Sequence, residues 1–380
     1  MIYLDNAATS FPKPSEVYEE VLNAMKNYSA NPGRGSHSMA IEASSRVMDT
    51  RSQLAELFCI PNPLNIIFTY NATEALNIAI KGALQKGDHV ITTILEHNSV
   101  LRPLDALSKK GVSYSLIGTD LEGHLVLDSL KKEIRKNTKA IIINHASNVL
   151  GVVQNLQEIS HIAKSHGLLL IVDASQSAGS LDINVRSLNI DLLAFPGHKG
   201  LLGPQGTGAL YIREGLRLET FKEGGTGSSS HSIAQPLFLP DRFESGTLNT
   251  PGIAGLGQGI KYIMREGREK IKGREDILLK QLLEELSPLD YVKIYGPKAI
   301  ENRTAVLSLN LEGFESSQVG MLLNSKGIAV RTGYHCAPFV HGVIGTMNRG
   351  TVRISPGCFN TPEDIEEVVK ALIDIYNHRN

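Results

Sequence analysis

The chain has 380 residues and a mass of 41.3 kDa, a length typical of roughly two to three domains. With 38 basic and 39 acidic residues, its formal net charge of −1 excludes the strong positive field expected of nucleic-acid or anionic-membrane binding. Its 42% hydrophobic and 20% charged residues exclude a disordered chain, and its three cysteines form no C-x-x-C pair.

No run of about 20 apolar residues is present, and the N-terminus lacks the basic and apolar regions of a signal peptide. Few cysteines and no disulfide framework are typical of a reducing compartment. We therefore expect a cytoplasmic enzyme with no nucleic-acid partner and no membrane partner.

Short apolar runs alternate with amphipathic segments between about residues 60 and 215. Strands are predicted at 65–69, 89–95, 112–117, 139–144, 168–173, 191–195 and 208–213, and helices at 73–85, 98–110, 128–136 and 155–166. This alternation predicts an α/β fold, in which helices flank a mainly parallel sheet. We assign this sheet to a large domain over residues 15–250.

The pattern changes near residue 250. Helices are predicted at 251–271, 273–286, 315–326 and 362–378, with strands at 292–296 and 305–311. We assign residues 1–14 and 251–380 to a smaller α+β domain. A ligand cleft is expected between the two domains, outside the carboxyl ends of the strands.

Polar residues follow five of the predicted strands. Because the carboxyl ends of parallel strands meet at one edge of a sheet, these residues are expected to converge on one site. They include Thr73, His97, the segment 145–148 with Asn148, the pair Asp173 and Gln176, and the pair His198 and Lys199.

Thr73 precedes an amphipathic helix, so its hydroxyl and the free backbone amides of the first turn can bind a phosphate dianion. The alternative is an ordinary helix cap in which Thr73 satisfies a backbone donor. No G-K-[ST] sequence and no G-x-G-x-x-G after a strand indicates a nucleotide site.

Lys199 lies between glycines after a buried strand, where a lysine with a lowered pKa can form a Schiff base with a carbonyl. Asp173 ends another strand, where a carboxylate can keep a pyridinium nitrogen protonated. The alternatives are a solvated lysine and a helix-capping aspartate. Together with the phosphate site, these residues indicate pyridoxal 5′-phosphate (PLP), with Gln176 near the ring hydroxyl and His97 over the ring.

Cys336 lies in a polar loop, with Arg331 and His335 nearby to favour its thiolate. One alternative is a buried, inert cysteine. Another is a zinc site with His335 and His341, although no fourth ligand is apparent. We expect no metal.

Eight segments together resemble the class V, fold-type I aminotransferase superfamily, and specifically its cysteine desulfurase and selenocysteine lyase branch. The segments are YLDNAAT (3–9), NATEALN (71–77), EHNS (96–99), SNVLG (147–151), VDASQSAG (172–179), GHKG (197–200), FESGTLNT (243–250) and RTGYHCAP (331–338). The resemblance covers essentially the whole chain and implies bound PLP and a group II-like catalytic loop.

The resemblance also implies individual roles. Lys199 forms the Schiff base, Cys336 accepts sulfur, and His97 stacks on the ring. The remaining cofactor contacts are Asp173 on the ring nitrogen, Gln176 near the phenolic oxygen, Thr73 and His198 on the phosphate, and Thr247 on the phosphate of a partner subunit in a homodimer. The substrate side comprises Ala7, Asn148, Arg331 and Arg353, of which Arg353 grips the amino-acid carboxylate.

Two residues depart from the family pattern, Pro196 in place of a serine and Tyr334 in place of a histidine. Arg34 and His37 are weaker candidates for lining the entrance of the site. The Gly/Ser run at 224–232 is a candidate for a lid or a dimer contact.

The resemblance implies a desulfurase that converts L-cysteine to L-alanine and passes a Cys336 persulfide to a sulfur-acceptor protein. The alternatives are a selenocysteine lyase, another class V lyase or transaminase, and a weakly active scaffold that binds a sulfur-transfer protein.

Overall fold

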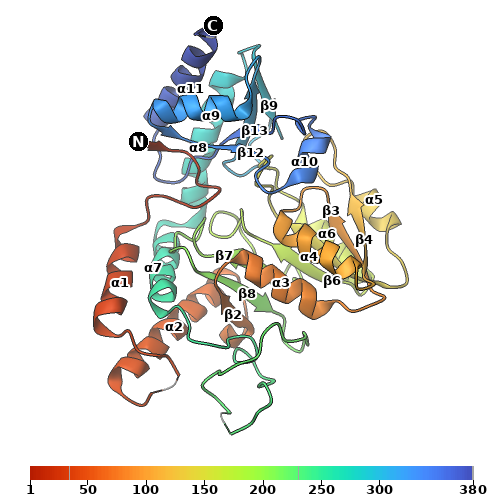
Figure 1. The fold of residues 1–380 in the computed structure, drawn as a ribbon, viewed down its shortest axis with the longest axis vertical. Helices are drawn as coiled ribbons and strands as arrows, with labels where there is room; N and C mark the ends of the chain where they lie inside the picture. The colour runs from red at the N-terminus through yellow and green to blue at the C-terminus, as the bar shows by residue number, and fades with distance from the viewer. Residues whose placement is uncertain (34, 230, 379–380) are drawn as a thin grey trace.

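The computed structural model describes residues 1–33, 35–229 and 231–378. A seven-stranded sheet forms the centre of the molecule, in the order β2-β8-β7-β6-β5-β3-β4 (Figure 1). The strands are β2 (Ile66–Thr69), β3 (His89–Thr93), β4 (Ser113–Ile117), β5 (Thr138–Asn144), β6 (Leu169–Asp173), β7 (Leu192–Pro196) and β8 (Gly208–Ile212). β8 runs antiparallel to both of its neighbours, and the pairs from β7 to β4 are parallel. The predicted mainly parallel sheet is confirmed.

Both faces of this sheet are buried because successive strand residues point to opposite sides. In β2, Ile66 and Phe68 join one hydrophobic cluster and Ile67 joins the other. One face is covered by α3 (Ala72–Ala83) and α4 (Asn98–Ser108). The other is covered by α2 (Ser38–Leu57), α5 (Leu127–Lys132), α6 (Leu156–Ser165) and α7 (Thr250–Glu266). This layering fixes the strand ends that carry the polar residues.

A second, four-stranded antiparallel sheet lies above the first, in the order β12-β13-β10-β9. Its strands are β9 (Val292–Tyr295), β10 (Leu307–Leu311), β12 (Arg331–Gly333) and β13 (Thr351–Ile354). Leucines of α8 (Arg268–Leu286), α9 (Ser316–Ser325) and α11 (Pro362–Asn377) share one buried cluster with this sheet. The short β1 (Ile2–Tyr3) pairs with β11 (Ile328–Ala329), so the N-terminus lies beside the C-terminal part of the chain.

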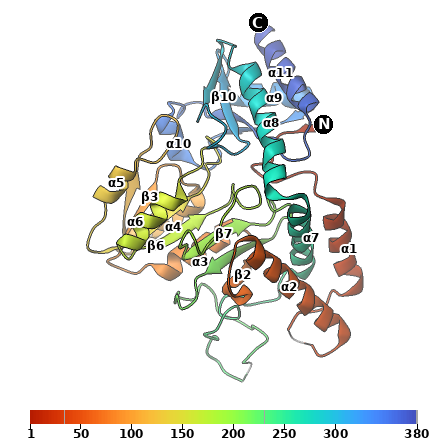
Figure 2. The same ribbon diagram turned by 180° about the vertical axis from the view of Figure 1, so that it is seen from behind.

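The remaining elements are α1 (Ser15–Asn27), the 3-10 turn η1 (Pro63–Asn65) and α10 (Pro338–Val343). Helix α7 packs against α1 and α2, and α8 continues from it into the upper part of the molecule (Figure 2). The division into domains of 15–250 and 1–14 plus 251–380 stays a proposal. Buried apolar residues of α7, which begins at residue 250, belong to the hydrophobic cluster on one face of the large sheet.

Over the described ranges, none of the helices combines the length and the low polarity needed to cross a membrane.

Candidate active site

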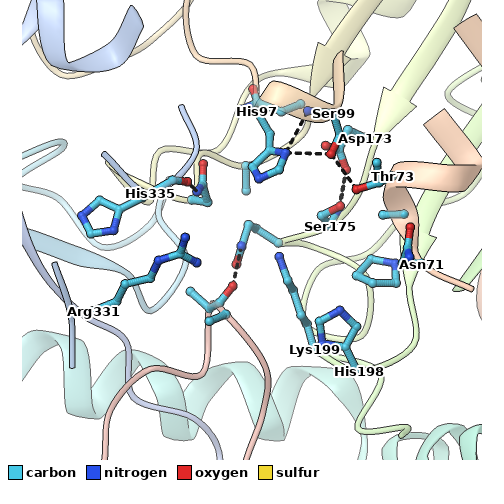
Figure 3. Close-up of a pocket in the computed structure, with 18 of the residues that line it drawn as sticks. Asn71, Thr73, His97, Ser99, Asp173, Ser175, His198, Lys199, Arg331 and His335 are labelled. Carbon is cyan, nitrogen blue, oxygen red and sulfur yellow. Dashed lines mark hydrogen bonds between the residues drawn. The ribbon is translucent and has the colours of Figure 1, made fainter. Parts of the chain in front are cut away.

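A cavity of about 200 Å³ lies where the strand ends of the large sheet meet the smaller sheet (Figure 3). Most of the predicted site residues line it: Ala7, Thr73, His97, Asn148, Asp173, Gln176, His198, Lys199, Arg331 and Arg353. They come from the N-terminal segment, from the ends of β2, β3, β5, β6 and β7, and from β12 and β13 of the smaller sheet. The convergence expected from the strand order therefore occurs.

Lys199 lies in the loop after β7 and points into the cavity. Removal from bulk water lowers the pKa of Lys199 to about 8, an effect that the nearby carboxylate of Asp173 opposes. In the part of the chain that the structure describes, no hydrogen bond or ion pair holds its amine. A substantial fraction of this amine is therefore neutral and nucleophilic near neutral pH.

Asp173 is the last residue of β6 and is buried at the cavity wall. Its Oδ1 accepts hydrogen bonds from the backbone N–H of Ser175, at 2.9 Å, and from the Ser175 hydroxyl. These bonds fix the orientation of the carboxylate at the cavity wall. Ser175 lies within the VDASQSAG segment but was not among the predicted site residues.

A chain of hydrogen bonds joins His97 to Thr73 through Ser99 (Figure 3). The Ser99 backbone N–H donates to Nδ1 of His97 at 3.0 Å, and the Ser99 hydroxyl lies 2.7 Å from that of Thr73. Because Nδ1 accepts this hydrogen bond, the proton of the neutral ring lies on Nε2. Burial lowers the pKa of His97 to about 4, so the ring is neutral at pH 7.

Thr73 lies in the first turn of α3, and Asn71 caps this helix by accepting from the backbone N–H of Glu74 at 2.9 Å. The cap is thus Asn71, and the Thr73 hydroxyl stays at the cavity. On the other side, Nδ1 of His198 is buried without a hydrogen-bond partner among the described residues. A buried polar nitrogen without a partner is costly, and in the tautomer that carries its proton on Nδ1 the ring would donate to an anion in the cavity.

Arg353 on β13 is 1% exposed and reaches the cavity from the smaller sheet. Its guanidinium donates to Oδ1 of Asp5 at 2.6 Å and to the backbone oxygen of Asn148 at 3.1 Å, whereas its Nε has no partner in the described chain. The bonds to Asp5 and Asn148 use two of the five N–H groups of this buried guanidinium, so it can still donate to a ligand. Asp5 lies in the YLDNAAT segment, but its pairing with Arg353 was not predicted from the sequence.

Cys336 is partly exposed beside the cavity, and the Nη2 of Arg331 lies 3.3 Å from its Sγ. His335 and Cys336 both adopt positive φ angles, of 50° and 61°, which cost energy in residues other than glycine. Hydrogen bonds hold this conformation: Asn148 donates to the His335 backbone oxygen at 2.7 Å, and the Asn98 backbone N–H donates to that of Cys336 at 2.8 Å.

Two neighbours complete this loop. The Tyr334 hydroxyl donates to the backbone oxygen of Met347, and burial lowers the pKa of His335 to about 2, which keeps it neutral.

Over the described residues, no group of three or more His, Cys, Asp or Glu side chains is placed to hold a metal. His341 instead bonds to Thr346, at 2.7 Å.

Several candidates lie elsewhere. Thr247 lines a different pocket, where Asn31 donates to its hydroxyl at 3.3 Å, so its role toward a partner subunit stays a prediction. His37 caps α2. Arg34 lies outside the described residues, as does Ser230 of the proposed lid.

His145, which follows β5, lines a second cavity behind the site rather than the central one. Burial lowers its pKa from 6.5 to about 4, so the folded chain resists protonation that the unfolded chain accepts. His145 should therefore contribute to the free energy of unfolding above pH 6.5, and this contribution should be lost as the pH falls toward 4. At pH 5 the loss from this residue should be about 2 kcal/mol.

The His145→Gln variant should accordingly lose less free energy of unfolding between pH 7 and pH 5 than the wild type does, as measured by urea denaturation. Equal losses in the two proteins would contradict this assignment. His166→Gln, on the exposed end of α6, is the matched control.

Comparison with known proteins identifies the family. Residues 2–368 match the Aminotransferase class-V family model. A probable cysteine desulfurase of Pyrococcus abyssi is 36% identical over 99% of this chain and 94% of that protein. The chain belongs to the cysteine desulfurase family.

Other members of the family agree in sequence and in structure. A cysteine desulfurase of Salmonella dublin is 32% identical over 99% of this chain and 93% of its own length. The apo structure of a cysteine desulfurase from Thermococcus onnurineus superimposes with a TM-score of 0.93 at 36% identity, covering 100% of this chain and 95% of that one. The predicted family and fold type are thus confirmed.

This family implies PLP, and the cavity fits that cofactor. It places an amine of lowered pKa, a fixed carboxylate and an unpartnered imidazole nitrogen around one space. Pro196 ends β7 and also lines the cavity, so it offers no side-chain hydroxyl where the family pattern has a serine.

Proposed function

We propose that this protein is a PLP-dependent cysteine desulfurase that converts L-cysteine to L-alanine and carries the sulfur as a persulfide on Cys336. The observation that carries the proposal is the juxtaposition of the Lys199 cavity with a cysteine whose sulfur lies 3.3 Å from Arg331. Neither feature alone separates a desulfurase from another enzyme of the class V superfamily.

Nine side chains are proposed to hold PLP and the substrate. Lys199 binds the cofactor covalently, Asp173 faces its ring nitrogen, and His97 and Gln176 contact the ring and its hydroxyl. The others are Thr73 and His198 on the phosphate, and Ala7, Asn148 and Arg353 on the substrate. When bound, PLP supplies an electron sink that stabilises negative charge at the substrate α-carbon.

With PLP bound, the amine of Lys199 would be the group that moves the α-proton of the substrate. A lysine of pKa about 8 exchanges protons efficiently near neutral pH. The neutral His97, fixed by the backbone of Ser99, presents its Nε2–H and a flat apolar face to the same space. Asp173 balances positive charge on the ring nitrogen.

Cys336 is proposed to receive the sulfur as its thiolate. A bond forms between Sγ and the substrate sulfur while the carbon–sulfur bond of the substrate breaks, and the β-carbon takes up a proton. The products are alanine and a persulfide, so no external oxidant is needed. The guanidinium of Arg331 donates to Sγ at 3.3 Å and so orients the sulfur beside the cavity.

The test is the formation of alanine and sulfide from L-cysteine by the PLP-loaded protein with a thiol reductant. Equimolar alanine and sulfide are expected. Absence of both products while PLP is bound would contradict the proposal. Turnover of L-selenocysteine alone would instead indicate a selenocysteine lyase. A sulfur-acceptor protein and a homodimer remain predictions.

Arg353→Lys tests the substrate contact. A lysine cannot offer the paired donors that grip a carboxylate, so the KM for L-cysteine should rise roughly 10- to 100-fold with a smaller change in kcat. Steady-state alanine formation measures both constants. Arg265→Lys, an exposed α7 residue paired with Glu16, is the control and should keep the wild-type KM. An unchanged KM in Arg353→Lys would remove the arginine from the substrate site.

A further inference from the structure

The N-terminal strap, residues 5–13, contacts three parts of the active site at once. Asp5 bonds to Arg353 at 2.6 Å, and the backbone oxygen of Ala7 accepts from Nε2 of Gln176 at 2.9 Å. The strap is itself anchored to the smaller sheet, because the backbone N–H of Ala7 donates to the Ser355 hydroxyl at 3.0 Å. The segment thus joins groups that the fold brings from distant parts of the chain.

The far end of the strap is bound to the loop that carries Lys199. The backbone oxygen of His198 accepts from the Ser10 backbone N–H at 3.0 Å and from the Thr9 hydroxyl at 3.1 Å. The Ser10 hydroxyl donates to the backbone oxygen of Lys199 at 2.9 Å. This loop follows β7 and contains glycines on both sides, so its own sequence restrains it little.

Lys13 is the charged residue among the strap residues that bond to the Lys199 loop. Its Nζ donates to the His198 backbone oxygen at 2.9 Å and to the Ser10 hydroxyl at 2.6 Å. Within the described ranges, no carboxylate forms an ion pair with it. An ammonium group that is partly buried without a counter-ion is costly, and its lowered pKa, about 8, reflects that cost. The charge-assisted hydrogen bonds from Lys13 to the His198–Lys199 loop offset this desolvation cost.

We propose that Lys13 is a positioning residue for Lys199, holding the His198–Lys199 backbone in place through the His198 carbonyl and Ser10. The inference rests on the proposed function, in which Lys199 binds PLP. Lys13 is not among the described residues that line the cavity. It acts by fixing the direction from which the Lys199 side chain enters the cavity and by placing a positive charge beside the loop that carries this lysine.

The test compares Lys13→Met with Lys13→Arg, which retains a charged donor, and with Lys26→Met, an exposed lysine at the end of α1, as control. Two readouts are used besides turnover: the rate at which PLP is lost on dilution, and the pH midpoint of the visible absorption of lysine-bound PLP. Lys13→Met should lose PLP about tenfold faster because a charge-assisted hydrogen bond is gone. Its midpoint should rise by about half a pH unit because a like charge is removed.

Lys13→Arg should lie between Lys13→Met and the wild type, and Lys26→Met should match the wild type. A Lys13→Met protein with wild-type PLP loss and a wild-type midpoint would overturn the inference, even if its thermal stability were lower. If Lys13→Met does not fold, Ser10→Ala, which removes one acceptor of Lys13 and one donor to the loop, should shift both readouts in the same direction. Wild-type readouts in that variant would also overturn the inference. A wild type that shows no visible absorption with PLP would instead contradict the proposed function itself.

Discussion

Lys199→Ala should abolish the visible absorption of lysine-bound PLP and lower alanine formation from L-cysteine by at least about a thousandfold, because both covalent attachment and a proton-transfer group are lost. The amine that the variant lacks is the one whose pKa is lowered to about 8 beside Asp173. Absorption spectra after loading with PLP, together with alanine assays, measure the effect.

The matched control is Lys86→Ala, an exposed lysine after α3. It should keep both the spectrum and the activity. A Lys199→Ala protein with the wild-type spectrum would show that another lysine binds the cofactor. The folded state of the variant is checked by circular dichroism, since removal of a partly buried amine should not unfold the chain.

Cys336→Ala should leave the visible absorption unchanged and eliminate sulfide release from L-cysteine, a loss of at least about a hundredfold, because Cys336 is the described cysteine that contacts a residue of the cavity wall, Arg331. The described chain places Cys59 on the surface after α2 and Cys358 in a neighbouring pocket. Burial raises the pKa of Cys358 to about 12, so its thiolate is not available near neutral pH.

Cys59→Ala is the control for this experiment and should turn over L-cysteine at the wild-type rate. Mass spectrometry of the wild type after a brief exposure to L-cysteine should find one added sulfur on the peptide that contains Cys336. Sulfide release by Cys336→Ala at the wild-type rate would exclude the persulfide route. Retained activity toward L-selenocysteine alone would fit a lyase, in which selenium leaves without a protein nucleophile.

Much of the large sheet is predictable because buried parallel strands leave a strong signal in the sequence. The runs predicted at 139–144 and 168–173 correspond to β5 and β6 with shifts of one residue at their starts. The polar residues after such strands converge for a topological reason: the carboxyl ends of parallel strands meet at one edge of the sheet, which places Asp173 and Lys199 at one site.

Contacts between side chains distant in the sequence could not be predicted in this way. Periodicity says nothing about the pairing of Asp5 with Arg353, nor about Ser99 joining His97 to Thr73. The same holds for the pairing of β1 with β11, which brings the first residues of the chain to the smaller sheet. These contacts depend on how strands, helices and sheets assemble in three dimensions, which local sequence does not encode.

The restraint on the Cys336 loop has a consequence for delivery. The Asn98 backbone N–H and the Asn148 side-chain amide donate to the backbone oxygens of Cys336 and His335, so the strained turn that carries the sulfur has little freedom to move. Under the proposed function, the Cys336 loop would therefore donate its persulfide sulfur from a fixed position, without moving toward the acceptor. The thiol of the sulfur-acceptor protein must therefore approach Cys336. We expect the acceptor to present this thiol on a protruding segment slender enough to reach the mouth of the cavity.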